Sequence, residues 1–580
     1  MGAFSKTFGM MQQGTLLNQT PVFSSATTAS FAENATGTVF TAIATPVDSY
    51  SIKAGGDGAS FNINTSTGVV TFKNTPDYET KNSYSLTVIA TKGSNTSEQT
   101  ITVTITQLTY AAGTYFVNDL TGNDNNNGLS PSTPWLTVAK VSGFTFTAGK
   151  TILFKRGHVW REVLTVHNAG TEGNRITYGA YGGGVRPIIK NSLDCSGLTW
   201  SVYSGSIYQA TKTGMPAACS AAWTGNMILI RAANLAGVNS AGKFFNDNAT
   251  NTLYVWMPDS TNPTGVTLEL SQSTANVVTC WKNYITIRDI RFAHGGGTYC
   301  VIMMYNSTTV DNNFINCEVG PTWKSGLFIG CLGGLVEKNY IHDCWTGLQY
   351  PSGITGSGIG VSADTNGTIV RKNWVERCYM GIALNALHKN ALIHNNIVLK
   401  NYVNGIDCEN GVAGFPTQIY NNFVWHKPTG TAGHGIDMQV GTDANVAAKI
   451  KNNIVYGDYT GAGTNVQLIA IDVANNADID INNNYYATAP GYNGSIGAFA
   501  LTNYATLALW KTALASTNVT GKDANSSIGD PLVVDLINSN FHLQSNSPCI
   551  NVGVDVGLTE DYEGNPIVGV PDIGAYEWQS

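Results

Sequence analysis

The motif Val336-Glu-Lys-Asn339-Tyr-Ile341 recurs along the second half of this 580-residue chain. In each copy, apolar strand-forming residues flank an Asn, and no helical period accompanies them. Further copies are centred on Asn373, Asn396, Asn422, Asn453 and Asn484, with Val310-Asp-Asn-Asn313-Phe-Ile315 before them and Ile287-Arg-Asp289-Ile290 as a degenerate first copy. Successive Asn residues from Asn313 onward are 23 to 34 residues apart. Such a period, with insertions of variable length, is typical of a solenoid.

Each copy of the motif fits one coil of a parallel β-helix. Asn tolerates the left-handed backbone conformation that a sharp bend between two strands needs. When coils stack at the strand spacing of about 4.8 Å, each Asn amide can donate a hydrogen bond to the next Asn. We therefore predict an all-β fold dominated by a right-handed parallel β-helix.

The composition is compatible with this fold and excludes several classes of function. Charged residues make up 12% of the chain and glycine occupies 63 positions, which suits strands and turns and disfavours a helical protein. The net charge of −7 gives no electrostatic support for a nucleic-acid partner. No run of about 18 apolar residues predicts a membrane span. The ten cysteines are too dilute for a disulfide scaffold, so we expect buried thiols.

The N-terminal residues 1–19 carry no fold signal, and we expect either an anchor to a larger assembly or a disordered tail. They lack the apolar segment and cleavage site of a signal peptide. The protein is therefore expected to leave its cell by lysis or within a particle, unless a signal has been removed.

Residues 20–108 resemble a cadherin-like repeat, which is an immunoglobulin-like β-sandwich. The matching segments are Phe31-Ala-Glu33-Asn34, Tyr50-Ser-Ile52, Phe61-Asn-Ile63, Thr67-Gly68-Val-Val70, Asp77-Tyr-Glu79 and Tyr84-Ser-Leu86-Thr-Val88-Ile-Ala90-Thr91. The resemblance implies that Glu33, Asp77 and Glu79 are calcium ligands. However, Lys92 stands where the family has an Asp, and no Asp-rich linker follows. We expect a spacer domain rather than a Ca²⁺ site.

Residues 109–580 resemble the pectate-lyase-like right-handed β-helix proteins. The motifs that carry the resemblance include Gly113-Thr-Tyr-Phe-Val117, Ala148-Gly-Lys-Thr151, Gly170-Thr-Glu-Gly173, Gly179-Ala-Tyr181-Gly182, Ser547-Pro-Cys549 and Asp572-Ile-Gly574-Ala-Tyr576. Between about residues 194 and 270 the coil pattern is interrupted by short segments that predict an antiparallel β excursion. Many activities share this scaffold, so the resemblance implies a fold rather than a reaction.

A second repeat places carboxylates in a row. Its copies are Gly326-Leu-Phe328-Ile-Gly330, Gly358-Ile-Gly360-Val-Ser362, Gly381-Ile-Ala383-Leu-Asn385, Gly405-Ile-Asp407-Cys-Glu409, Gly435-Ile-Asp437-Met-Gln439 and Ala470-Ile-Asp472-Val-Ala474. Strand alternation predicts that Asp407 and Glu409 point away from the core, opposite to Ile406 and Cys408. Stacking in register would align Asp407, Asp437 and Asp472 on neighbouring coils. Small residues on the earlier coils would form the floor beside this acidic patch.

These side chains are the candidates for chemistry. Carboxylates one coil apart lie about 5 Å from each other, which is near the separation in retaining glycosidases, and two coils apart they approach the separation in inverting ones. Such proximity would raise one pKa and leave one acid and one base. We take Asp407, Asp437, Glu409 and Asp472 as candidate catalytic residues. His434 joins them because Gly433-His434-Gly435 resembles a segment of polygalacturonases. The alternatives are a cation- or sugar-binding row and a solvated surface.

Other side chains could bind a sugar chain. The candidate substrate-binding residues are Trp345, Tyr350, Asn385, Gln439 and Lys324. Aromatic rings stack on sugar rings, although they also fill β-helix interiors. A lyase would need a Lys, Arg or His base beside a neutralised uronate, and no spacing selects one.

A sandwich ahead of a β-helix resembles a phage tailspike, a virion surface protein. That resemblance implies binding, and in many members cleavage, of a host capsule, lipopolysaccharide or exopolysaccharide. It also implies a homotrimer and attachment to baseplate or tail proteins through the N-terminus. The alternatives are a secreted bacterial polysaccharide lyase or glycoside hydrolase, and a non-enzymatic adhesin or fibre component. None of these readings requires a cofactor.

Overall fold

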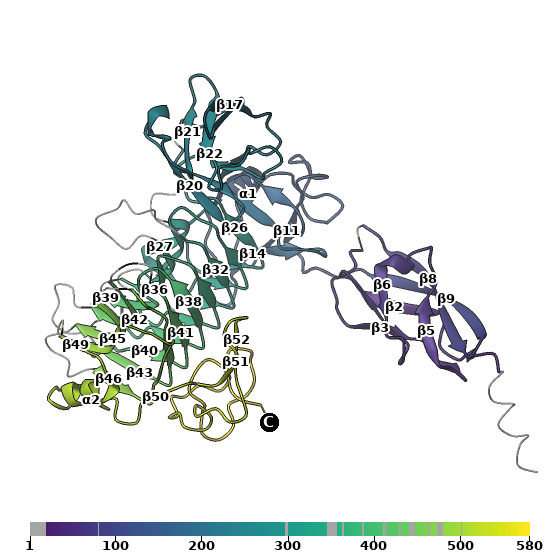
Figure 1. Cartoon of the computed structure of the whole chain (residues 1–580). Coiled ribbons are helices and arrows are strands. Elements are labelled where there is room, and N and C mark those ends of the chain that lie inside the picture. The colour runs from purple at the N-terminus through teal and green to yellow at the C-terminus, as the bar shows by residue number, and fades with distance from the viewer. Residues whose placement is uncertain are drawn as a thin grey trace, which may run out of the picture. The chain divides into compact units, whose positions relative to one another are not determined.

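The structure is a computed structural model of the chain, shown in Figure 1. It describes residues 19–78, 80–217, 219–295, 300–344, 356–361, 365–385, 388–409, 412, 414–428, 430, 432–439, 447–461, 465–472, 479–499 and 502–579. The chain divides into two compact units. The first comprises residues 1–135, 153–158 and 180–187, and the second comprises the remainder.

The first unit contains a β-sandwich. Its sheets have the strand orders β2-β9-β8-β5 and β3-β7-β6, and a two-stranded ribbon pairs β1 with β4. The strands are β1 (Val22–Phe23), β2 (Thr28–Ala32), β3 (Thr38–Thr41), β4 (Ala44–Thr45), β5 (Ser49–Ile52), β6 (Phe61–Ile63), β7 (Val69–Phe72), β8 (Ser83–Lys92) and β9 (Asn95–Thr106), with a 3-10 turn η1 (Gly58–Ser60). The alternating residues Leu86, Val88 and Ala90 of β8 lie in its core, as the sequence pattern predicts. This unit also contains β10 (Thr114–Val117) and most of β11 (Thr151–Lys155).

The second unit is a right-handed parallel β-helix whose coils contribute one strand each to three long sheets (Figure 1). Sheet 1 contains β14 (Ile176–Tyr181), β25 (Ile285–Arg288), β28 (Asn313–Ile315), β31 (Leu335–Glu337), β34 (Ile369–Arg371), β37 (Leu392–His394), β40 (Thr417–Tyr420), β43 (Ala448–Lys451) and β46 (Ile479–Asn482). Sheet 2 contains β12 (Val159–Trp160), β15 (Ile188–Lys190), β26 (Arg291–Ala293), β29 (Glu318–Val319), β32 (Tyr340–His342), β35 (Trp374–Glu376), β38 (Ile397–Asn401), β41 (Phe423–His426), β44 (Ile454–Gly457), β47 (Tyr485–Thr488) and β50 (Ser527–Ile528). Sheet 3 contains β13 (Leu164–Val166), β24 (Val278–Cys280), β27 (Cys300–Val310), β30 (Ser325–Leu332), β33 (Ser357–Val361), β36 (Met380–Leu384), β39 (Ile406–Glu409), β42 (Ala432–Gln439), β45 (Asn465–Asp472), β48 (Ser495–Phe499) and β49 (Thr502–Tyr504).

The interior of the helix is filled by columns of aliphatic side chains. Val336, Val370 and Ile393 form one column through paired strands of sheet 1 and are fully buried. All ten cysteines are buried and free, as the sequence suggests. The core therefore rests on apolar burial rather than on disulfide bonds.

The Asn ladder forms at the bend between sheets 1 and 2. The side-chain amide of each Asn donates to the carbonyl oxygen of the next, with distances of 2.9 to 3.0 Å along Asn339, Asn373, Asn396, Asn422, Asn453 and Asn484. These side chains are buried, so the ladder satisfies polar groups that could not otherwise reach water. At its far end the backbone N–H of Asn484 donates to the hydroxyl of Ser526.

Two details of the predicted ladder are wrong. The left-handed residue of each bend precedes the ladder Asn, for example Lys338 with φ 58° before Asn339. The ladder Asn instead supplies hydrogen bonds from the buried side of the bend. The copy placed at Asn313 is also out of register, because Phe314 pairs with Val336 and so Cys317 occupies the ladder position. The backbone N–H of Cys317 accordingly donates to the side chain of Asn339.

An eight-stranded sheet interrupts the helix between β15 and β24. Its strand order is β16-β23-β19-β20-β21-β22-β18-β17, and all pairs are antiparallel except β20 with β21. The strands are β16 (Ser192–Asp194), β17 (Ser201–Ser204), β18 (Ile207–Thr211), β19 (Ala221–Thr224), β20 (Met227–Arg231), β21 (Lys243–Asp247), β22 (Thr252–Trp256) and β23 (Glu269–Ser271), with a 3-10 turn η2 (Leu235–Gly237). It has its own apolar core around Leu229, Phe244 and Val255. We call it the excursion sheet.

Two short helices and a C-terminal segment complete the second unit. The helices are α1 (Val138–Gly143) and α2 (Leu507–Ala515), and a hairpin of β51 (Val533–Asp535) and β52 (Asn540–Leu543) follows. Phe541 of the hairpin packs on Phe423 and Trp425 of sheet 2. Trp425 is thus a core residue of this contact. Across the described residues, no helix has the length and apolar character needed to cross a membrane.

Candidate functional site

Asp407 and Asp437 lie directly opposite each other on neighbouring strands of sheet 3. The predicted register holds from Phe328 through Gly360 and Ala383 to these two residues. The glycine that opens each of the first five copies of the repeat favours this alignment. A Cβ atom on Gly405 would come 2.5 Å from the carbonyl oxygen of Gly435, so the coils approach too closely for any side chain there.

The predicted alignment of Asp472 with this pair is wrong. Asp437 faces Ala470, and Asp472 faces Gln439, two residues further along the strand. Ile469 and Ile471 alternate in the same way, so a shift of two residues keeps apolar side chains on the same face. The side chains of Asp472 and Gln439 lie outside the described part of the structure, while the backbone of Gln439 pairs with that of Glu409 as predicted.

Asp407 and Asp437 are buried, with 0% and 1% of their surface exposed. The alternative of a solvated acidic surface is therefore wrong. One side chain joins the two carboxyls, since Asn404 Nδ2 donates to Asp407 Oδ1 at 3.0 Å and to Asp437 Oδ2 at 3.1 Å. The Asn404 carbonyl oxygen in turn accepts the backbone N–H of His434. We call Asp407 and Asp437 the carboxyl pair.

The surroundings of the carboxyl pair favour the protonated form of Asp407. Burial holds the pKa of Asp407 well above its usual range, and the negative charges of Asp437 and Glu409 and a hydrogen bond with Asp437 raise it further. Asn404 opposes this shift by stabilising the ionised form. The protonation of Asp407 is therefore coupled to Asp437, and Asp407 keeps its proton to a higher pH than an ordinary aspartic acid does.

Glu409 and His434 are the partly exposed neighbours of the pair. Burial, and then the charge of Asp437, raise the pKa of Glu409. His434 Nε2 lies 3.8 Å from Asp437 Oδ2, and 16% of the His434 side chain is exposed. The pair is therefore flanked by two side chains that are partly exposed.

The predicted sugar-binding residues are only partly gathered at this site. Asn385 is half-buried and follows β36, in the coil before that of Glu409. Lys324 precedes β30, three strands before β39 in sheet 3, and is therefore about 14 Å away along the helix axis. Burial lowers its pKa. Trp345 and Tyr350 lie outside the described residues.

Asn404 is the residue of this site that the sequence reasoning did not single out. Its signal was present, because Asn404-Gly-Ile-Asp407 and His434-Gly-Ile-Asp437 place a polar residue three positions before each Asp. Pairing of β39 with β42 brings both of these residues beside the carboxyls.

The candidate calcium ligands of the sandwich are engaged with the protein itself. Glu33 is buried and accepts the backbone N–H groups of Leu108 and Tyr78. Asp77 Oδ2 lies 2.7 Å from Lys155 Nζ, and Glu79 lies outside the described residues. Across the part of the chain that the structure describes, no group of three or more His, Cys, Asp or Glu residues is arranged to hold a metal ion.

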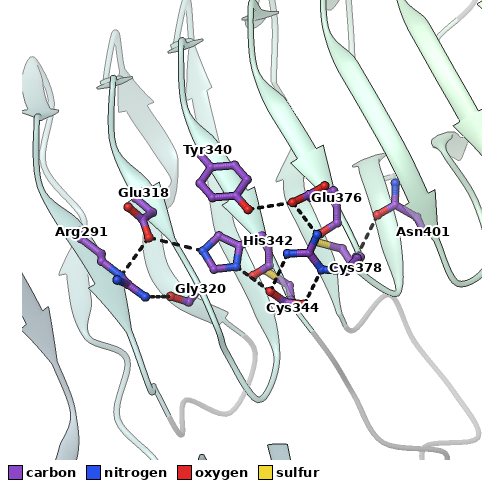
Figure 2. A network of polar contacts seen from close by, with 11 residues as sticks. Arg291, Glu318, Gly320, Tyr340, His342, Cys344, Glu376, Cys378 and Asn401 are labelled. Atoms are coloured by element: carbon purple, nitrogen blue, oxygen red, sulfur yellow. Dashed lines mark hydrogen bonds and ion pairs between the residues drawn. The ribbon is translucent and has the colours of Figure 1, made fainter. Parts of the chain in front are cut away.

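A second polar cluster lies on sheet 2 (Figure 2). His342 Nδ1 contacts Asp343 Oδ2 at 2.7 Å, and its Nε2 lies 3.5 Å from Glu318, which Arg291 also contacts. Despite burial, these carboxylates raise the pKa of His342 to about 9, so that the imidazole is charged at neutral pH.

The cluster continues to the next coil through Arg377. Its guanidinium holds Asp343 in a bidentate pair, with Nε–Oδ1 and Nη2–Oδ2 distances of 2.9 and 3.0 Å, and also contacts Glu376. His342 and Arg377 keep the pKa of Asp343 below its usual value despite burial. Asp343 and Arg377 both have φ of 52° and occupy the left-handed turn positions that follow β32 and β35.

A pocket of about 590 Å³ opens beside this cluster. The helix contributes Asp343, Arg377 and Tyr402, and the excursion sheet contributes a largely apolar wall that includes Met227, Ile228 and Ile230. Its volume lies in the range of small-molecule sites.

Comparisons with known proteins identify the two folds. Residues 27–106 match the family model of the cadherin domain, and residues 276–438 match that of the right-handed β-helix region. The second unit is a right-handed β-helix. No curated protein sequence matches the chain.

Solved structures extend the likeness over most of the chain. XylC in complex with xylose has 13% identity and a TM-score of 0.50, covering 80% of this chain and 98% of that one. A glycoside hydrolase has 11% identity and a TM-score of 0.50, covering 69% and 98%. The pectate lyase Pel9A has 16% identity and a TM-score of 0.43, covering 80% and 96%. At these identities the likeness to the first two structures shows the fold alone.

Proposed function

We propose that the protein binds a polysaccharide and cleaves it as a glycoside hydrolase at the carboxyl pair. The observation that carries the proposal is the buried pair Asp407–Asp437, which retains a proton beside the partly exposed Glu409. Glycosidases use two carboxyl groups, and the surroundings of these groups keep one protonated and the other ionised. The likeness of the fold to a xylose-bound protein and a glycoside hydrolase is in keeping with a sugar substrate.

The geometry favours hydrolysis with inversion. Asp407 and Glu409 lie two residues apart on one face of β39, so their Cα atoms are about 7 Å apart. If the two carboxyl groups keep this backbone spacing, they lie within the carboxyl separation of about 6.5–9.5 Å that leaves room for a water molecule in inverting enzymes. The carboxyl pair itself is hydrogen-bonded and leaves no such room between its members.

The proposed reaction divides acid and base between these groups. Protonated Glu409 gives its proton to the glycosidic oxygen as the bond between this oxygen and the anomeric carbon breaks. The carboxyl pair, which holds one proton and one negative charge, takes a proton from the attacking water. The oxygen of that water bonds to the anomeric carbon, and both carboxyl groups return to their starting states by proton exchange with solvent. Asn404 keeps the pair in position.

Incubation with polysaccharides tests this proposal. The purified protein is mixed with capsular, lipopolysaccharide, exopolysaccharide and plant cell-wall glycans, and chain length and reducing ends are followed. We expect new reducing ends without the ultraviolet absorbance of an unsaturated uronate. Absorbance of that kind would show that the protein is a lyase. Intact chains in every digest would show that it does not cleave these glycans and would favour a binding protein or a fibre component.

The biological setting remains a sequence-based proposal. We propose a virion surface location on a phage tail, with attachment through the N-terminus and assembly as a homotrimer, and a secreted bacterial enzyme is the alternative. Light scattering of the purified chain separates a trimer from a monomer. A tailspike would in addition be detected by antibodies on purified phage particles.

A further inference from the structure

We propose that the pocket between the excursion sheet and the helix binds a neutral sugar unit of a glycan. Its helix-side wall presents ionised and polar groups, and its other wall presents mainly apolar side chains together with Asn226, Ser240 and Lys243. A sugar ring has the matching surfaces, namely a face of C–H groups and an edge of hydroxyl groups. The role of this unit in cleavage rests on the proposed function, whereas its binding does not.

The polar wall is fixed in position before any ligand arrives. Arg377 grips Asp343 through two hydrogen bonds and contacts Glu376, while His342 contacts the other side of Asp343. Figure 2 shows His342 and Glu376 of this network on adjacent strands of sheet 2. The carboxylate of Asp343 is ionised, so its remaining lone pairs accept hydrogen bonds from hydroxyl groups.

The same contacts favour a neutral ligand over a uronate. The guanidinium of Arg377 already faces two carboxylates, Asp343 and Glu376, so little of its charge remains to attract a third. Lys243, the cation of the other wall, donates to the side-chain oxygen of Asn239 at 2.8 Å. A carboxylate ligand would also lie against ionised Asp343 and be repelled by it. Hydroxyl groups meet neither obstacle, because they donate to Asp343 and accept from Arg377 or the Tyr402 hydroxyl.

The apolar wall offers exposed side chains to the pocket. Met227 and Ile230 of β20 are 53% and 40% exposed, whereas Leu229 between them is buried in the core of the excursion sheet. Beside them, a Cβ atom on Gly242 would meet nothing within 4 Å, which is the open space of the pocket. Burying these side chains against the C–H face of a ring recovers hydrophobic free energy.

The pocket also lies close to the carboxyl pair along the chain. Tyr402 lines the pocket and is only two residues before Asn404, which holds the pair. Five residues separate Tyr402 from Asp407, so their Cα atoms are at most about 18 Å apart. An oligosaccharide of a few units spans that distance.

A glycan microarray probed with the Asp407→Asn protein tests binding without cleavage. The array presents neutral and uronate-containing glycans from plants, fungi and bacteria, and calorimetry with the soluble form of the best ligand follows. Ala241→Trp fills the pocket from its exposed rim, and Ala249→Trp is the matched control in an exposed turn of the same sheet. Met227→Ala removes apolar surface, and Val202→Ala does the same on β17 outside the pocket.

We expect a neutral glycan to bind, and Ala241→Trp and Met227→Ala each to weaken it about tenfold or more. The two control variants should bind as the parent protein does. Binding of uronate-containing glycans alone, equal affinity in the pocket variants, or no glycan bound at all would each overturn the proposal. Since binding is measured without turnover, a protein that binds in this way but cleaves nothing would refute the proposed function and leave the pocket intact.

Discussion

At the scale of single residues, the carboxyl groups of sheet 3 predict a distinct dependence of activity on pH. Glu409 must be protonated to act as the acid, and its raised pKa means that activity is lost as pH rises through that value. The carboxyl pair must carry one negative charge, so activity is also lost when the pH falls far enough to protonate both members. We expect a bell-shaped profile of kcat/KM in a reducing-end assay, with an alkaline limb that Glu409→Gln removes along with about 10²–10⁴-fold of the rate. An unchanged alkaline limb in Glu409→Gln would assign the acid to another group.

His342 predicts a pH dependence of stability rather than of activity. Its pKa is raised from 6.5 to about 9 in the folded protein, so its stabilising contribution is complete below pH 6.5 and is lost as pH rises through 9. The shift corresponds to on the order of 3 kcal/mol. We expect the free energy of unfolding, measured by urea titration, to fall between pH 6.5 and 9 in the parent protein. His342→Asn should flatten that fall, while His542→Asn at an exposed site should retain it.

At the scale of elements, the Asn ladder predicts where a small change has a large effect. Asn396→Ala removes the oxygen that accepts both the backbone N–H and the side-chain amide of Asn373. These donors are buried, so the loss should cost about 1–3 kcal/mol per unsatisfied group in a urea titration. Asn366→Ala, at an exposed position that accepts from Asn390, should cost far less. Equal effects of the two variants would mean that the ladder contributes no more than a surface hydrogen bond.

The same element shows what could be predicted from the sequence. The ladder from Asn339 to Asn484 could be predicted because each copy combines an Asn with apolar residues that must face the core. The prediction at Asn313 was wrong because Val310-Asp-Asn-Asn313 has the same residue types at the preceding bend, between sheets 3 and 1. The predicted alignment of Asp472 was wrong because a shift of two residues leaves the apolar alternation in Ile469-Ala-Ile471 unchanged. Register there depends on pairing with β42, which a single sequence does not contain.

The candidate site could be predicted only in part for a related reason. Alternation places Asp407 on the face opposite to Ile406, but it says nothing about what covers that face. The burial of Asp407, and therefore its raised pKa, comes from tertiary packing. Sequence reasoning likewise had no means to bring Met227 of the excursion sheet beside Arg377, about 150 residues further along.

At the scale of the whole molecule, the contacts within the sandwich predict that calcium does not change the stability of the protein. Glu33 is occupied by backbone N–H groups and Asp77 by the ammonium group of Lys155, so a cation would have to displace these partners. Calcium at a concentration 100 times its Kd would stabilise a binding site by about 2.7 kcal/mol. We expect the melting temperature of the full chain to be the same in Ca²⁺ and in EDTA. A higher melting temperature in Ca²⁺ would show that the protein binds calcium, as the cadherin resemblance implies.

The central claim is that the carboxyl pair of the β-helix cleaves a glycan, and the rate of reducing-end release by Asp407→Asn tests it most directly. Asp458→Asn, which breaks an ion pair with Lys427 elsewhere on the helix, is the matched control. Because Asn replaces a buried carboxyl that is crowded by Asp437 and Glu409, the variant should fold and melt at no lower a temperature than the parent. On a glycan that the parent protein cleaves, we predict a fall of about 10²–10⁴-fold for Asp407→Asn and no change for Asp458→Asn. Full activity of a folded Asp407→Asn protein would contradict the account.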